Sequence, residues 1–185
     1  MEQYPKRKYP RASWWRYDSG IYFVTICTKL HKHYFGRIEY GKMNSYPLGI
    51  FLSECINNIK LHYNNVDIPH FVVMPNHVHL IVVIDGLLPY SGIRVSCMQV
   101  NVQQRVSDVS SVRKRIEKDG VRERLSVVIG GVKAAVTRYA NQQQINFAWQ
   151  RGFHDHIIQS WDECNRIAQY IINNPVTWHL DCFYG

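Results

Sequence analysis

The stretch HFVVMPNHVHLIVVI (residues 70–84) is the most informative part of this chain, because two apolar runs meet in it at Pro75-Asn76. Both runs are rich in β-branched and aromatic residues, which is typical of strands. Proline followed by asparagine suits a tight turn. The stretch is therefore predicted to form two adjacent strands, and two histidines, His77 and His79, stand just beyond the turn.

The two histidines are predicted to project from one face of their strand, because residues two apart in a strand share a face. The alternate positions from Val78 to Ile84 are all apolar, which indicates a strand buried in the sheet. Buried imidazoles need partners, either a shared metal ion or phosphate or hydrogen bonds within the core. A histidine-triad nucleotide hydrolase is disfavoured, since its third histidine would fall on Ile81.

The rest of the chain predicts an α+β fold in a single domain of residues 1–185. The predicted elements are a strand at 20–28, a hairpin at 35–46 with Gly41 near its turn, a helix at 48–63, a helix that begins at about Gly131 within the stretch 125–144, a strand at 153–160, and a last helix that Ser160 caps and Pro175 bounds. Glu163, three residues after Ser160, completes a capping box. This order favours a ferredoxin-like antiparallel sheet with helices packed on one face.

The charge of the chain indicates a polyanionic partner. The formal net charge is +8 and the pI is about 9.3, and basic surfaces attract nucleic acid. No apolar run of about 18 residues is present, so we expect neither a membrane span nor a membrane partner. Five widely spaced cysteines without a CxxC pair favour reduced thiols in a cytoplasmic protein.

Two basic segments are candidates for DNA contact. In an N-terminal arm (residues 1–19), aromatic side chains could stack on bases while basic ones hold phosphates; the alternative is a tail packed on the domain edge. These predicted DNA-binding residues are Lys6, Arg7, Lys8, Arg11, Trp14, Trp15 and Arg16. The second segment, a polar insertion at 85–125, carries seven basic and four acidic residues between Arg105 and Arg124, a net charge of +3. It is either a solvated insertion or a DNA-contacting arm.

The last helix supplies a row of polar side chains beside its apolar stripe. Residues four apart stack on one helical face, which aligns Arg166, Tyr170 and Asn174. The core contacts predicted for this helix are Cys164, Ala168, Ile171 and Ile172. Two imidazoles and an amide oxygen suit a divalent ion with open positions, and a tyrosine beside it can attack a metal-polarised phosphate. A packing or base-binding role for Tyr170 is the alternative.

Two further motifs compete with these assignments. Tyr139, with Gln143 four residues on, is a rival nucleophile, although its helix also carries Lys133 and Arg138 and looks like a DNA-facing or structural element. The second HxH, His154-Asp155-His156, could be an independent metal site.

The motifs MPNHVHLIV (74–82) and YIINNP (170–175) together resemble the single-tyrosine HUH nucleases, most closely the REP-associated tyrosine transposases of bacteria. The resemblance implies that His77, His79 and Asn174 bind Mg²⁺ or Mn²⁺ and that Tyr170 is the nucleophile. It also implies an enzyme that cleaves and rejoins single-stranded or hairpin DNA through a 5′-phosphotyrosine intermediate, leaving a free 3′-hydroxyl.

This chain departs from the family pattern in two places that concern substrate recognition. Gln159 stands where an arginine is common, and the 85–125 insertion is longer than expected. The alternative function is a catalytically idle, domesticated nucleic-acid-binding module on the same fold. The sequence also leaves open whether the active unit is a monomer or a homodimer.

Overall fold

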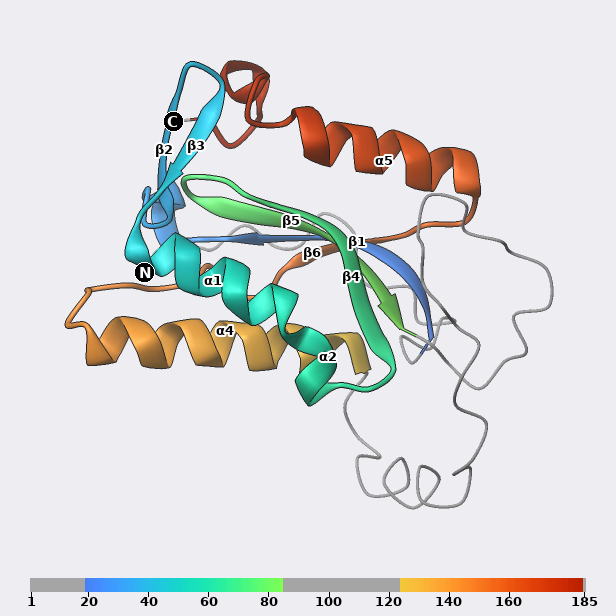
Figure 1. Ribbon diagram of the computed structural model, residues 1–185, viewed down its shortest axis with the longest axis horizontal. Coiled ribbons are helices and arrows are strands. Elements are labelled where there is room, and N and C mark those ends of the chain that lie inside the picture. The colour runs from blue at the N-terminus through green and yellow to red at the C-terminus, as the bar shows by residue number, and fades with distance from the viewer. Residues whose placement is uncertain (1–18, 85–123, 185) are drawn as a thin grey trace, which may run out of the picture.

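A four-stranded antiparallel sheet forms the centre of the molecule (Figure 1). The computed structural model describes residues 19–84 and 124–184, so the predictions for the N-terminal arm and for insertion residues 85–123 lie outside the described residues. The sheet order is β4(Val66–Val73), β5(His77–Ile84), β1(Gly20–Cys27), β6(His154–Ile157). With helices between β1 and β4 and between β5 and β6, this is the ferredoxin-like arrangement, which confirms the predicted α+β class.

The predicted strand pair around Pro75-Asn76 is confirmed. β4 and β5 pair antiparallel up to Val73 and Val78, and the Met74 N–H donates to the His77 carbonyl at 2.8 Å. β5 lies between β4 and β1, so both its edges are paired and both its faces are covered. Its apolar positions are buried in the larger core cluster; they are Val78, Leu80, Val82 and Ile84.

Three helices cover one face of the sheet: α1(Pro47–Asn57), α2(Ile59–His62) and α4(Arg124–Gln142) (Figure 1). The predicted single helix at 48–63 is interrupted at Asn58, whose φ of −91° and ψ of 9° lie outside the helical region. The prediction that the next helix begins at about Gly131 is wrong, because α4 begins at Arg124. Leu125, Val128 and Ile129 are fully buried, and this packing outweighs the weak helix propensity of the β-branched residues.

The fourth helix, α5(Trp161–Asn173), packs on the opposite face, so the expectation that all helices share one face is wrong in this detail. The strip of α5 at positions 164, 168 and 171 contacts Ile81, which points away from the larger core. Ile172, predicted to be a core residue, is 56% exposed, since it follows Ile171 by about 100° around the helix.

The predicted start of α5 is confirmed. The Ser160 hydroxyl accepts the Glu163 N–H at 3.2 Å, and the Glu163 carboxylate accepts the N–H of Gln159 at 2.8 Å. The first bond satisfies an amide that the first turn of a helix leaves without an intrahelical partner, and the second holds the residue before the N-cap against the helix. α5 is therefore fixed at its beginning, next to the end of β6.

Short elements complete the structure around the end of the sheet. β2(Gly36–Glu39) and β3(Lys42–Ser45) form the predicted hairpin, with φ of 52° at Tyr40 and 72° at Gly41 in its turn. The remaining elements are η1(Lys29–His31), after β1, and η2(Trp178–Leu180), after α5. None of the helices that the structure describes is long and apolar enough to span a membrane.

Candidate active site

His77 and His79 lie side by side on the face of β5 that α5 covers, as predicted. Their exposed fractions are 0% and 2%, and their Nε2 atoms are 3.0 Å apart. Their burial is deeper than a position at the strand end suggests, because the rings of Trp178 and Phe183 pack against His77 at centroid distances of 5.7 and 4.7 Å. The two imidazoles thus direct one nitrogen each to a common point that water does not reach freely.

The Nδ1 atoms of both histidines are held by neighbouring side chains, one from the turn before β5 and one from β1. Nδ1 of His77 lies 2.8 Å from Oδ1 of Asn76, and Nδ1 of His79 lies 2.8 Å from the Thr25 hydroxyl. The Asn76 amide donates both to the His31 and to the Phe183 carbonyl, so its Oδ1 is the acceptor and His77 Nδ1 carries the hydrogen. This leaves the Nε2 lone pair of His77 available, which is how neighbouring residues orient metal-binding histidines.

Tyr170 brings its hydroxyl to this point from α5. The Tyr170 oxygen is 3.2 Å from Nε2 of His79 and donates to Oδ2 of Asp181, also at 3.2 Å. The tyrosine is 42% exposed, whereas both histidines are buried. Tyr170 is therefore the part of the cluster that a molecule in solution can reach.

Asn174 lies one helical turn after Tyr170, and it is 1% exposed. Its Nδ2 donates to Oδ2 of Asp181 at 2.9 Å. Its Oδ1 is buried and has no hydrogen-bond partner among the described residues. A buried amide oxygen without a partner is costly, and a cation bound at this point would satisfy it.

Asp181 is the site residue that the sequence did not reveal. It comes after η2, and its side chain is 1% exposed. Its Oδ1 accepts the Phe183 N–H at 2.8 Å, and its Oδ2 lies 3.9 Å from Nε2 of His77. Asp181 has no periodic relation to Tyr170 or to the histidines, so no local pattern could have identified it.

Burial controls the protonation of the cluster. Desolvation, followed by the neighbouring His79, lowers the pKa of His77 to about 3, and desolvation lowers that of His79 to about 4. Burial, followed by the charge of Asp181, raises the pKa of Tyr170 to about 12. Burial alone would raise the pKa of Asp181, but hydrogen bonds from the Phe183 N–H and the Asn174 amide, together with the neighbouring His77 and His79, leave this pKa lowered. The resting cluster is thus two neutral imidazoles, a phenol and a carboxylate.

Acid should destabilise the metal-free protein through the two histidines. In the unfolded chain a histidine titrates near pH 6.5, whereas the folded values are about 3 and about 4. Between these limits the unfolded chain binds more protons, so stability is fully present above about pH 6.5 and falls on acidification. The expected slope is up to about 1.4 kcal/mol per pH unit for each histidine.

Urea unfolding in EDTA across this range measures that slope. The double variant His77→Gln, His79→Gln should show a clearly flatter dependence than the parent. An unchanged slope in the double variant would mean that other groups, and not this pair, couple folding to pH.

The donor atoms of the cluster fit a divalent metal ion. One ligand atom each from His77, His79 and Asp181 can lie within 4.8 Å of one another, and Asn174 Oδ1 is the additional oxygen. Two imidazole nitrogens with carboxylate and amide oxygens are ligands suited to Mn²⁺ and comparable ions. The buried, unpartnered Asn174 oxygen is the structural observation that supports this fit.

The rival motifs lie elsewhere. Tyr139 is on α4, on the other side of the sheet, where its ring stacks on Phe51 at 4.1 Å and 7°. His154 and His156 are on β6, two strands away from β5, and His156 pairs with Glu163 at 2.7 Å. Among the described residues, no group of three or more potential metal ligands includes this second pair.

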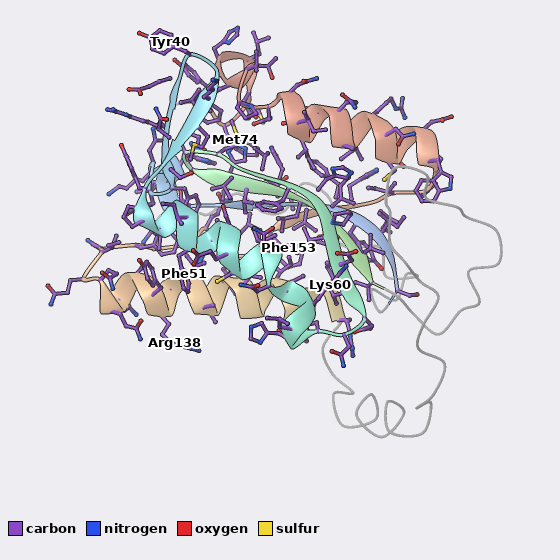
Figure 2. All side chains as sticks on the ribbon, in the orientation of Figure 1. Tyr40, Phe51, Lys60, Met74, Arg138 and Phe153 are labelled. Atoms are coloured by element: carbon purple, nitrogen blue, oxygen red, sulfur yellow. The ribbon has the colours of Figure 1, made fainter. Side chains whose placement is uncertain are left out.

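The two described DNA-binding candidates are also on α4. Lys133 donates to the carbonyls of Gln150 and Gly152, both at 2.8 Å, so two of its three donors serve the protein itself. Figure 2 shows Arg138 on the outer side of α4, pointing away from the sheet. Both residues lie on the sheet face opposite the histidines, and DNA that contacts Arg138 and Tyr170 together would have to pass around the domain.

One sequence relative establishes the family of this chain. An uncharacterized protein of Haemophilus influenzae is 31% identical over 180 residues, which span 96% of the present chain and 93% of the relative. The chain therefore belongs to the same protein family as this H. influenzae protein. No known family profile matches the chain.

Two solved structures are distantly similar. A REP-associated tyrosine transposase bound to a REP hairpin has a TM-score of 0.48 and 17% identity, covering 96% of this chain and 74% of the transposase. A Deinococcus radiodurans R1 protein proposed to be a transposase has a TM-score of 0.38 and 15% identity, covering 92% and 97% of the two chains. Both likenesses are weak, and the functional assignment below rests on the side chains of the site.

Proposed function

We propose that this protein is a metal-dependent DNA strand transferase that cuts single-stranded or hairpin DNA through a covalent link to Tyr170. The observation that carries this proposal is the position of the Tyr170 hydroxyl, 3.2 Å from Nε2 of His79, which itself lies 3.0 Å from Nε2 of His77. A nucleophile next to two convergent imidazole nitrogens that can bind a metal ion is the arrangement that metal-assisted attack on a phosphodiester uses.

The residues proposed to hold Mg²⁺ or Mn²⁺ are His77 and His79 through Nε2, Asn174 through Oδ1, and Asp181 through its carboxylate. The ion, when bound, would neutralise the negative charge of a phosphodiester and so permit an anionic nucleophile to approach. Thr25 and Asn76 hold the imidazoles in place through their Nδ1 atoms. Asn174 is held by its bond to Asp181.

The chain's own groups can carry the proton of the attacking phenol. The Tyr170 hydroxyl donates to Oδ2 of Asp181, and this carboxylate is placed to take the proton as the tyrosine oxygen attacks phosphorus. The new bond joins the tyrosine oxygen to the 5′-phosphate as the bond between phosphorus and the 3′-oxygen breaks. The leaving 3′-oxygen takes a proton from water to become a free 3′-hydroxyl. Because the phosphotyrosine keeps the ester bond energy, a 3′-hydroxyl can reverse the step and join strands without ATP.

DNA binding is proposed to involve the basic and aromatic residues of the N-terminal arm and two basic residues of α4. The N-terminal arm, with Trp14 and Trp15 among its basic residues, would hold the phosphate backbone, and Lys133 and Arg138 would contact a folded hairpin from α4. We expect the protein to act in the cytoplasm. The active unit is either a monomer or a homodimer.

A catalytically idle DNA-binding module is the second candidate function. The observation in its favour is the closure of the site, since His77 is 0% exposed beneath the rings of Trp178 and Phe183. A phosphate could reach His77 only if the segment after α5 moved aside. A module that binds without cutting has no need of such a movement.

A covalent-adduct assay separates the two candidates. Labelled single-stranded DNA with hairpin-forming sequences is incubated with the protein and Mn²⁺ and then run on a denaturing gel. The strand-transferase proposal predicts a labelled, protease-sensitive protein–DNA band that EDTA prevents. Tight DNA binding without any such band, across substrates and metal ions, would favour the idle module.

A further inference from the structure

The sheet face that carries the histidines is covered unevenly. α5 packs mainly against β4 and β5. Among the described residues, it reaches β1 only through Ile21 and Phe23, which pack partly exposed against its apolar cluster, and β6 through the bond between Glu163 and His156. Pairing between β1 and β5 places Thr25 opposite His79, and pairing between β1 and β6 places Thr25 opposite His154 and Phe23 opposite His156. Residues directly opposite in antiparallel strands share a face. Phe23, His154 and His156 are therefore on the same face as the site.

The two histidines of β6 have different surroundings, although both are exposed. His156 is bound to the Glu163 carboxylate at 2.7 Å, which ties β6 to the first turn of α5. His154 has no hydrogen-bond or ion-pair partner among the residues that the structure describes. At the usual spacing of strands it lies about 10 Å from His79, two strands across the sheet. The His154 imidazole is thus an exposed donor beside the site, without a hydrogen-bond partner among the described residues.

Phe23 connects this open side to the nucleophile. Its ring stacks on His79 at a centroid distance of 5.2 Å and meets the Tyr170 ring edge-on at 6.1 Å. It is only partly buried, although it sits in the middle of the face. An aromatic ring with an accessible part next to a reactive tyrosine can stack on a base or pack against a sugar.

We propose that the β1–β6 side of this face, marked by Phe23 and His154, holds the single DNA strand that flanks the phosphate attacked by Tyr170. This inference rests on the proposed function. A strand that reaches Tyr170 finds α5 over β4 and β5 and the segment of Trp178 and Phe183 over His77. Among the described residues, the side toward β6 is the approach that these elements leave open. There Phe23 contacts a base, and the His154 imidazole donates to a phosphate, consistent with the basic charge of the chain.

The test measures equilibrium binding of a fluorescent single-stranded oligonucleotide in EDTA, where cleavage cannot occur. Phe23→Leu should weaken binding about tenfold, as loss of one stacked base does, whereas Phe23→Trp should retain it. His154→Ala should also weaken binding about tenfold through the lost bond to a charged oxygen. The matched control is His62→Ala, an exposed histidine on α2 at the opposite face, which should bind like the parent.

Each outcome decides the proposal. If both variants bind like the parent and the control while the parent forms a covalent adduct, the β1–β6 side does not carry the strand and the proposed function stands. If the parent neither binds DNA nor forms an adduct, both fail together. If Phe23→Leu loses the Mn²⁺-induced rise in Tm, Phe23 acts by supporting His79 and its proposed contact with DNA is wrong.

Discussion

Replacing Tyr170 by phenylalanine is expected to leave DNA binding intact and to remove the covalent protein–DNA product entirely. The change deletes one oxygen from a residue that is 42% exposed, so the packing of α5 against the sheet should hardly change. The hydroxyl contacts with His79 and Asp181 are lost, but every proposed metal ligand remains. Binding is measured by anisotropy, Mn²⁺ binding by the rise in Tm, and the adduct on a denaturing gel.

Tyr139→Phe is the matched control for this experiment. Tyr139 stacks on Phe51 at 4.1 Å on the other side of the sheet, and so it is remote from the histidines. The variant should form the adduct at the rate of the parent. An adduct that persists in Tyr170→Phe and disappears in Tyr139→Phe would show that the nucleophile has been assigned to the wrong tyrosine.

His77→Ala and His79→Ala should each abolish Mn²⁺ binding and, with it, DNA cleavage. A metal that binds only the folded protein raises Tm in proportion to its affinity, so the parent should show a Mn²⁺-dependent rise and these variants should show none. Because the two rings are 0% and 2% exposed, each variant also leaves a cavity, and its metal-free Tm must be compared with that of the parent.

Two variants test the oxygen ligands separately. Asp181→Asn keeps the shape of the side chain but removes its charge, and it should weaken Mn²⁺ binding about tenfold or more. Asn174→Ala removes the amide whose buried Oδ1 has no partner among the described residues, and excess Mn²⁺ should restore part of its cleavage. Unaltered calorimetric Mn²⁺ affinity in either variant would remove that residue from the site.

The sequence by itself determined the features that depend on local periodicity. The two-residue period of a strand placed His77 and His79 on one face, and the spacing of four in a helix placed Tyr170 and Asn174 together. Ser160 and Glu163 marked the beginning of α5, and the order of strands and helices gave the ferredoxin-like class. These features follow from the geometry of single elements, which short stretches of sequence encode.

Only the tertiary structure decided how those elements meet. It placed α5 on the face opposite α4, exposed Ile172, and brought β6 alongside the site through its pairing with β1. It also returned the chain after α5 to the site, so that Asp181 lies beside His77 across more than a hundred residues of sequence. Such contacts depend on which apolar faces are buried together. The free energy that decides between alternative packings is a sum over the whole core, so no single stretch of sequence contains it. A residue such as Asp181 therefore carries no local signal, and only the folded chain shows that it belongs to the site.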